Sequence, residues 1–394
     1  MNRRQLLTLG AVLPVASVCG RLYALPNAPG KLLVLFLRGG YDATSLLVPI
    51  STDFYYEVRP NIAIGRRGSD PNATLPVDAS WGLHPSLRET IYPLFMQRQV
   101  AFVPFCGTDD VSRSHFETQD SIEMGQPLAG SRDFQSGFLN RLVSVLNGRQ
   151  PIAFTDQLPI ILRGEKDVPN MALRSLGKPG LDGRQSAIIG GMYQRTALAP
   201  VVNEGFGLRD EVMQVMAPEM EAANRGAITT KGFELEAQRV AKLMADKFDI
   251  GFVDVGGWDT HVGQGAATGY LAGRFDELGR ALSAFAREMG PRWSNTVVVV
   301  ISEFGRTFRE NGNRGTDHGH GSVYWILGGA IHGGRVAGDQ VSLSPATLFQ
   351  NRDYPVLNDY RAVFAGLFIR MYGLDTARLS KVFPNARAKD IDLI

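Results

Sequence analysis

Residue types that bind metal ions gather between Gly256 and Gly321. Three of the six histidines of the chain lie in this stretch, each within three residues of an aspartate. Asp259 and His261 are two residues apart, so on an extended chain both side chains lie on one face and can reach one ion. A second group of candidate ligands follows further along: Glu303, Asp317, His318 and His320. We therefore predict a metal site formed by two half-sites.

The two groups combine imidazoles and carboxylates without cysteine, which indicates the class of metal. Such ligands are typical of Zn²⁺ or Mn²⁺, and a set with fewer histidines would suit Ca²⁺ or Mg²⁺. A bound divalent ion can polarise a phosphoryl or sulfuryl oxygen and activate a hydroxyl or water nucleophile. The alternative for each His–Asp pair is a structural hydrogen bond.

Asp42 is a further candidate ligand because it stands where a predicted strand ends. It follows the apolar run Lys31–Leu37 after a turn that contains Gly39 and Gly40. Proteins of the α/β class place their functional residues at the carboxyl ends of strands. Asp42 can therefore be a metal ligand or a phosphate-site residue, or it can be the N-cap of a helix. The local sequence leaves both interpretations open.

Ser114 is the candidate nucleophile. It lies between Arg113 and His115, after the predicted strand Val100–Phe105 and near the start of a helical pattern. A helix N-terminus favours an anion or a nucleophile of lowered pKa. The alternative is an N-cap serine, which this segment taken alone favours. Three arginines near these candidates have planar forks that suit a tetrahedral oxyanion: Arg38, Arg113 and Arg306.

The elements that position these residues follow from the apolar patterns. Apolar runs without alternation predict buried strands of a largely parallel sheet: Lys31–Leu37, Val100–Phe105, Phe248–Val255, Thr296–Ile301 and Val323–Leu327. An amphipathic helix at Tyr270–Met289 makes a βαβ unit that places the ligand loops at the sheet's carboxyl edge. Further helices are expected at Phe134–Leu146, Glu211–Ala223, Gly232–Met244 and Asn358–Tyr372. Leu158–Leu162 is interpreted as an edge strand with a proline, or as part of a cap.

The first 24 residues have the three-part form of a secretory signal. A basic region with Arg3 and Arg4 precedes the mostly apolar stretch Leu9–Val18 and small residues up to Ala24. The paired arginines followed by leucines resemble a twin-arginine signal, which implies the twin-arginine export machinery as a partner. The alternative is an N-terminal membrane anchor, but the apolar stretch is short for a span. We expect a periplasmic or secreted protein.

Composition limits what the mature chain can do. Removal of residues 1–24 leaves 38 basic residues against 39 acidic ones, and no basic block that would indicate nucleic acid. Cys106 would be the one cysteine left, so no intramolecular disulfide is expected. We expect no membrane span in the mature chain. We predict one domain over residues 25–394, with a cap or insertion around residues 150–230.

Several motifs in the same order resemble those of the DUF1501 family, exported bacterial proteins of about this length. They are Leu37–Asp42, Ser112–Phe116, Gly257–His261, Ser302–Thr307 and Gly315–Gly319. That family is grouped with the alkaline phosphatase and sulfatase superfamily. The resemblance implies an alkaline-phosphatase-like three-layer α/β sandwich, with a central, mostly parallel sheet, helices on both faces and a metal site at the carboxyl edge.

The resemblance also implies roles for single residues. The positions that resemble metal ligands of the superfamily are Asp42, Asp259, His261, Asp317 and His318. Ser114 falls where a Ser or Thr nucleophile would stand. Glu303 occupies the place directly after a strand where the Asp-His pair of the superfamily normally stands. Glu303 and Asp317 are therefore alternatives for one ligand position.

Two functions follow from these observations. The leading hypothesis is an exported, metal-dependent hydrolase of phosphate or sulfate esters, acting on a small-molecule or envelope-associated anionic ester. In it Ser114 or a metal-bound water attacks, the metal holds the developing charge, and the arginines bind the oxyanion. The alternative is a non-catalytic family member that keeps a structural metal and serves envelope assembly or partner binding.

Overall fold

The computed structural model describes residues 30–129, 132–172, 183–207 and 232–394. The predicted signal segment 1–24 and the predicted helix Glu211–Ala223 lie outside the described residues. Among the residues that are described, no helix has the length and apolar character that a membrane span requires. The domain boundaries and the cap around residues 150–230 stay predictions.

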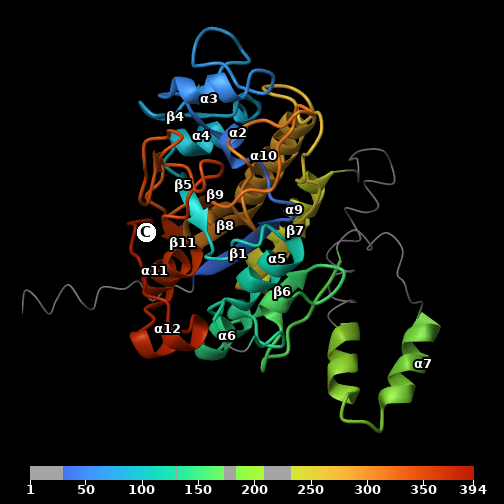
Figure 1. Cartoon of the computed structure of the whole chain (residues 1–394). Coiled ribbons are helices and arrows are strands. Elements are labelled where there is room, and N and C mark those ends of the chain that lie inside the picture. Colours follow the sequence, from blue (N-terminus) through green and yellow to red (C-terminus); the bar gives the residue numbers. More distant parts are fainter. Residues whose placement is uncertain (1–29, 130–131, 173–182, 208–231) are drawn as a thin grey trace, which may run out of the picture.

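A mostly parallel sheet forms the centre of the fold (Figure 1). Its strands are β1 (Lys31–Leu37), β5 (Val100–Gly107), β6 (Pro151–Phe154), β7 (Ile250–Val255), β8 (Thr296–Ser302), β9 (Ser322–Gly328), β10 (Arg335–Val336) and β11 (Asn358–Asp359). The strand order is β10-β5-β9-β8-β1-β7-β6, and β11 also pairs with β5. β9 runs antiparallel to β5 and β8, whereas the other strand pairs described in this sheet are parallel. The predicted central, mostly parallel sheet is therefore confirmed.

β1 lies inside the sheet because its apolar residues are continuous. It pairs in parallel with β7 on one side and with β8 on the other. Successive side chains of a strand point to opposite faces, and here they enter two core clusters: Leu33, Leu35 and Leu37 on one face, Leu32, Val34 and Phe36 on the other. A strand that is buried on both faces needs such a run rather than an alternating pattern.

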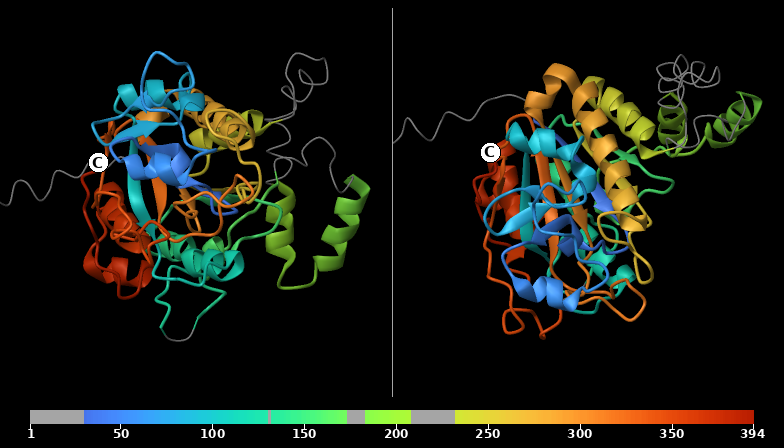
Figure 2. Two further views of the ribbon diagram at one scale, coloured as in Figure 1. Left: turned by 45° about the horizontal axis from the view of Figure 1, so that its top comes forward. Right: turned by 90° about the horizontal axis from the view of Figure 1, so that it is seen from above.

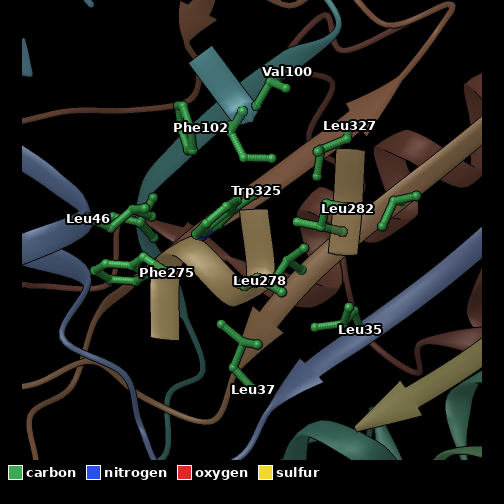
Figure 3. Close-up of a cluster of buried hydrophobic side chains, with 14 of the residues drawn as sticks. Leu35, Leu37, Leu46, Val100, Phe102, Phe275, Leu278, Leu282, Trp325 and Leu327 are labelled. Carbon is green, nitrogen blue, oxygen red and sulfur yellow. The ribbon is translucent and has the colours of Figure 1, made fainter. Parts of the chain in front are cut away.

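Helices cover both faces of the sheet (Figure 2). α9 (Phe233–Asp246) and α10 (Tyr270–Met289) pack on one face, and α6 (Phe138–Val145), α11 (Tyr360–Tyr372) and α12 (Thr376–Val382) pack on the other. Figure 3 shows Phe275 of α10 beside Leu46, and Leu278 of α10 on the side of the cluster where Leu35 and Leu37 of β1 lie. The predicted three-layer α/β arrangement is confirmed.

Shorter elements also occur among the described residues. The helices are α2 (Ala43–Leu46), α3 (Asp53–Val58), α4 (Ile91–Met96), α5 (His115–Met124) and α7 (Gly183–Tyr193). The 3-10 helices are η1 (Pro85–Leu87), η2 (Ile160–Leu162) and η4 (Gly290–Asn295). A small antiparallel sheet has the order β2-β4-β3, with β2 at Leu47–Pro49, β4 at Trp81–Leu83 and β3 at Leu75–Pro76.

α10 connects the two strands whose ends carry the candidate ligands. It has the predicted bounds, Tyr270–Met289, because its apolar residues recur at helical spacing and face the core. It leads from β7 to β8, and both strands are parallel to β1, which lies between them. The carboxyl ends of β1, β7 and β8 consequently meet at one edge of the sheet.

Residues 150–162 differ from the prediction. Leu158–Leu162 ends in the 3-10 helix η2 instead of forming an edge strand, and the edge strand is β6, at Pro151–Phe154. β6 pairs in parallel with β7. A run of four apolar residues carries too little pattern to identify a strand, so the tertiary pairing with β7 decides its conformation.

His84 shows how burial couples the fold to pH. Its Nδ1 accepts from the backbone N–H of Ser86 at 3.1 Å, and its Nε2 donates to the carbonyl of Ala266 at 3.1 Å. The ring is buried and packs on Phe275. Burial disfavours the imidazolium and lowers the pKa of His84 from 6.5 to about 4, with the Ala266 contact opposing the shift.

We expect the free energy of unfolding to decrease as pH falls from about 6.5 to about 4. In this window the unfolded chain binds a proton at His84 that the folded chain does not, so up to about 3 kcal/mol is lost. Urea denaturation of the wild type and of His84→Asn at several pH values measures this. The variant should lose part of the acid slope, whereas equal slopes would assign the acid sensitivity to other groups.

Candidate metal centre

Three segments meet at the carboxyl edge of the sheet. α5 begins shortly after β5 ends, the first ligand loop (residues 256–269) follows β7, and the second ligand loop (residues 303–321) follows β8. The loops touch through the backbone, because the N–H of Thr316 donates to the carbonyl of Thr260 at 3.0 Å. A Cβ atom at Gly315 would lie 2.3 Å from the carbonyl oxygen of His261, so only glycine permits this approach.

His115, Asp259 and His318 form the centre of the candidate site. One ligand atom of each lies within 4.8 Å of the others. The rings of His115 and His318 are 4.3 Å apart between centroids, and Phe304 packs on both. The Asp259 side chain is 43% exposed, so solvent reaches the group. We call these three residues the ligand group.

Hydrogen bonds orient the two imidazoles of the ligand group. Nδ1 of His115 lies 2.8 Å from Oε1 of Glu303, and Nδ1 of His318 lies 3.0 Å from the carbonyl oxygen of Arg113. Both partners are acceptors when Glu303 is ionised, so each Nδ1 carries a proton, and in the neutral ring that a metal requires each Nε2 presents a lone pair. The hydrogen bond to Glu303 raises the pKa of His115, so without a metal ion its imidazolium is favoured. Nε2 of His115 is buried, and among the described residues it has no hydrogen-bond partner within the usual geometry, although Oδ2 of Asp259 lies 3.5 Å from it. Histidines that bind metal ions are typically held in this way through the other ring nitrogen.

The backbone of Arg113 contributes to this arrangement. Its φ is +55°, in the left-handed region that bulky residues rarely adopt. Its carbonyl accepts from His318, while Ser114 next to it is the N-cap residue of α5. A costly conformation of this kind persists where surrounding contacts determine it, and such conformations are common at functional sites.

His261 lies beside the ligand group. Its Nε2 is 2.9 Å from Oδ1 of Asp259 and 3.1 Å from Nε2 of His318. Its Nδ1 is 3.2 Å from Oδ1 of Asp317, so both ring nitrogens face carboxylate oxygens. Nε2 of His261, Nε2 of His318 and Oδ1 of Asp259 therefore lie close together. Nitrogen ligands around one tetrahedral Zn²⁺ are roughly 3.3 Å apart, so these residues fit a metal ion.

Asp259 is kept ionised by Arg306. Nη1 of Arg306 donates to Oδ1 of Asp259 at 2.6 Å, and its Nε and Nη2 donate to the hydroxyl and the carbonyl of Thr316. Burial raises the pKa of Asp259, but the hydrogen bond and charge of Arg306 outweigh it, and the pKa is lowered. Burial, followed by the charges of His115 and Arg306, lowers the pKa of His318 and favours the neutral ring that a metal requires.

Glu303 lies outside the ligand group and forms a hydrogen bond with His115. Its Oε1 accepts from Nδ1 of His115, from the backbone N–H of Gly39 and from the side chain of Gln119, each at 2.8 Å. Its Oε2 accepts from the hydroxyl of Ser302 at 2.8 Å. Burial raises the pKa of Glu303, but the hydrogen bonds from His115 and Gln119 outweigh it and lower the pKa. Glu303 is therefore not one of the three residues of the ligand group, and its hydrogen bond orients the ring of His115.

We expect Glu303→Gln to weaken metal binding about 10- to 100-fold, because a neutral amide orients and polarises His115 less well than a carboxylate. Competition with a chromophoric chelator measures the affinity. Glu123→Gln is the matched control, since Glu123 is also buried but binds Arg38 and the backbone of Ile161. Equal affinity in Glu303→Gln and the control would contradict the prediction.

Asp42 lies in an ion pair instead of the ligand group. It is 0% exposed, and both of its oxygens accept from the guanidinium of Arg59, at 2.6 and 3.0 Å. Oδ2 also accepts from Ser45 and from Gln264, each at 2.7 Å. Burial raises the pKa of Asp42, but the charge of Arg59 outweighs it and lowers the pKa. Asp42 is the residue before α2, yet among the described contacts its side chain makes no capping bond there.

The predicted arginines all contact protein acceptors. Arg38 donates to Glu123 at 2.7 Å and to Asp254 at 2.9 Å, and it lines a cavity of about 230 Å³ at the end of β7. Arg113 donates to Asp353 at 2.9 Å and to Gln350. Because these donors already have partners, an oxyanion would have to compete with carboxylates for them.

The structure places the other predicted site residues around the ligand group. Ser114 directly precedes His115 at the N-terminus of α5, and its hydroxyl makes no capping bond within the described part of the chain. Oδ1 of Asp317 lies within hydrogen-bond distance of Nδ1 of His261, at 3.2 Å. His320 packs its ring on Phe349 and does not belong to the ligand group found among the described residues.

His115 is the candidate ligand that sequence reasoning missed. It entered the sequence analysis as the neighbour of Ser114, without a metal role. The available signal was its position at the first residue of a helix that follows a strand end, the criterion that selected Asp42. Its proximity to Asp259 and His318 depends on how β5 lies in the sheet, which the sequence pattern does not show.

Comparisons with known proteins give one family model and several solved structures of low identity. A family model described as "Protein of unknown function (DUF1501)" matches residues 30–383. A comparison with curated proteins finds no match. Among solved structures, a protein in the alkaline phosphatase superfamily from Vibrio parahaemolyticus has 13% identity and a TM-score of 0.37, covering 84% of this chain and 69% of that chain.

Two further solved structures are similar over most of the chain. The lipoteichoic acid synthase LtaP from Listeria monocytogenes has 10% identity and a TM-score of 0.41, covering 96% of this chain and 82% of that chain. An alkaline phosphatase from the Antarctic bacterium TAB5 has 12% identity and a TM-score of 0.29, covering 76% of this chain and 92% of that chain.

Proposed function

The chain belongs to the DUF1501 family, and we propose that it is an exported, metal-dependent hydrolase of phosphate or sulfate esters. The observation that carries the proposal is the convergence of His115, Asp259 and His318, in which the buried Nε2 of His115 faces Oδ2 of Asp259 at 3.5 Å. Imidazole-rich ligands, with His261 beside them, favour Zn²⁺ or Mn²⁺ over Ca²⁺ or Mg²⁺.

His115, Asp259 and His318 would hold the ion, which supplies a Lewis acid that polarises the ester and activates a nucleophile. Glu303 keeps the Nε2 lone pair of His115 directed at the group. Arg306 keeps Asp259 ionised and fixes the direction of its carboxylate. The partial exposure of Asp259 leaves the group open on one side, as catalytic metal sites are.

The N-terminus of α5 is the expected position of the anionic ester group. α5 begins at His115, so its first free N–H groups lie next to a ligand ring. The helix dipole favours negative charge at this end. The hydroxyl of Ser114, one residue earlier, is the proposed nucleophile, with a solvent water as the second candidate. The secretory-signal form of residues 1–24 supports a location in the periplasm or outside the cell, and the proposed substrate is a small-molecule or envelope-associated ester.

The alternative is a non-catalytic member with a structural metal, serving envelope assembly or partner binding. It is favoured by the ion pairs of Arg38, Arg113 and Arg306 with protein carboxylates, because donors with partners contribute less to binding an incoming anion. The ion pair of Asp42 with Arg59 likewise reduces the carboxylates available to a second ion.

Elemental analysis combined with turnover of generic phosphatase and sulfatase substrates tests the proposal. We expect about one equivalent of Zn²⁺ or Mn²⁺ per chain and ester hydrolysis that a chelator removes and the metal restores. Parallel assays with an aryl phosphate and an aryl sulfate decide which ester is used. A stable protein that binds metal but turns over neither ester would support the structural alternative, and a stable protein without metal would contradict both.

A further inference from the structure

We propose that Gln264 is a positioning residue that ties both ligand loops to the buried Asp42–Arg59 ion pair and thereby sets metal affinity. The statement about affinity rests on the proposed metal centre, whereas the link between the loops does not. Gln264 is 0% exposed and lies in the first ligand loop, outside the ligand group. Its side chain bridges three segments that are distant in the sequence.

The amide of Gln264 has one orientation that satisfies its partners. Nε2 donates to Oδ2 of Asp42 at 2.7 Å, and Oε1 accepts from the hydroxyls of Thr260 and Thr316, each at 3.1 Å. An ionised carboxylate can only accept, so the NH₂ group has to face Asp42 and the oxygen has to face the two hydroxyls. Thr260 lies in the first ligand loop and Thr316 in the second, and both are buried. One amide therefore holds both loops.

The chain of contacts continues from Thr316 to the ligand group. Because the hydroxyl of Thr316 donates to Gln264, its lone pairs face Nε of Arg306, which donates to it at 3.2 Å. Nη2 of Arg306 donates to the carbonyl of Thr316 at 2.5 Å, and Nη1 donates to Oδ1 of Asp259 at 2.6 Å. The guanidinium plane is thus fixed at one end by Thr316 and aims its other end at a candidate ligand.

The Asp42–Arg59 pair supplies a rigid anchor for this chain of contacts. Nε and Nη2 of Arg59 donate to the carbonyls of Phe308 and Thr307, at 2.7 and 2.9 Å, while Nη1 and Nη2 bind Asp42. Both carbonyls directly follow Arg306 in the second ligand loop. The anchor therefore holds the second loop directly, and it holds the first loop through Gln264.

A buried network of this kind acts as a unit, since its members polarise one another and each loses its partner when one is removed. Replacing Gln264 by methionine keeps a similar volume but leaves the hydroxyls of Thr260 and Thr316 without their acceptor. Arg306 can then rotate, and Asp259 with it. We expect both ligand loops to loosen together, although only one of them carries the substitution.

Hydrogen–deuterium exchange of the full chain without metal tests the link. In Gln264→Met we expect amide exchange in both residues 256–269 and residues 303–321 to accelerate about ten-fold or more. Thr316→Val, which removes only the hydroxyl, should accelerate amide exchange in both loops to a smaller extent. This variant replaces Gln264→Met in the test if Gln264→Met fails to fold. Asn140→Leu is the matched control, because Asn140 is a buried amide on α6 whose bonds go to Leu162 and Lys166. It should leave both loops unchanged.

Chelator competition for Zn²⁺ and Co²⁺ tests the effect on the metal. We expect the Kd of Gln264→Met to rise about ten-fold or more, as for other residues behind metal ligands, and the Co²⁺ absorption spectrum to change. Asn140→Leu should keep the Kd of the wild type. Faster exchange confined to the first loop, or no change in either loop, would overturn the link. Faster exchange in both loops with an unchanged Kd would overturn the role of Gln264 in metal affinity. A wild type that binds neither metal would contradict the proposed function. In that case the exchange result would still decide whether Gln264 links the two loops.

Discussion

Asp259→Asn is expected to abolish metal binding and hydrolysis together. The affinity should fall at least about 100-fold and kcat/KM at least about 1,000-fold. The physical reason is the loss of the one negative charge in the ligand group, where the amide also leaves Arg306 without an anionic partner. Chelator competition and steady-state kinetics with the better of the two aryl esters measure both effects.

Asp276→Asn is the matched control for this substitution. Asp276 has a similar exposure to Asp259, 40% against 43%, and it also pairs with an arginine, Arg280, at 2.9 Å. It lies on α10 outside the ligand group, so metal binding and turnover should equal those of the wild type. Hydrolysis that survives in Asp259→Asn would rule out this group as the active site, even if the protein is a hydrolase.

Arg59→Met is expected to destabilise the folded protein by about 3–5 kcal/mol. Removing one partner of a buried ion pair leaves the other charge uncompensated, and Asp42 and Arg59 are both 0% exposed. Chemical denaturation measures the loss. The double variant Asp42→Leu with Arg59→Met should recover part of it, because the unpaired charge is then absent.

The same experiment separates two roles of Asp42. An ion-pair role predicts equal destabilisation with and without a chelator, since no metal ion takes part. A ligand role, as the position of Asp42 at a strand end predicts, would make most of the loss depend on the presence of metal. A metal-dependent loss would therefore return Asp42 to the list of candidate ligands.

The main elements of the fold could be predicted from local patterns. Lys31–Leu37 is a strand as predicted and α10 has the predicted bounds, because burial on both faces and helical spacing leave clear signatures in the sequence. β6 lacked such a signature and was missed, since its four residues are held by the pairing with β7. The antiparallel direction of β9 is likewise a property of its neighbours and not of its own residues.

The candidate site could be predicted only to the level of segments. The strand-end rule brought Asp259, His261 and His318 to one edge, where the structure also has them in contact. The strand-end rule could not show that His115 lies with these residues, or that Glu303 binds Nδ1 of His115. These depend on side-chain directions in loops, where no periodic pattern constrains the chain.

The sequence by itself determined which segments are buried and which residue types are available for chemistry, because both depend on short-range patterns of apolar and ligand residues. Only the tertiary structure decided which side chains form hydrogen bonds and ion pairs with one another. Asp42 binds Arg59 and also Gln264, which lies 222 residues away, and Arg306 binds Asp259 from another loop. Such pairings are selected when loops from separate strands pack together and every buried charge has to find a partner. Gly256 to Gly321 therefore supplies most of the candidate ligands and, in Glu303 and Arg306, two of the residues that orient them. Elsewhere in the chain lie His115, the Arg113 carbonyl that binds His318, and the Asp42–Arg59 pair that binds Gln264.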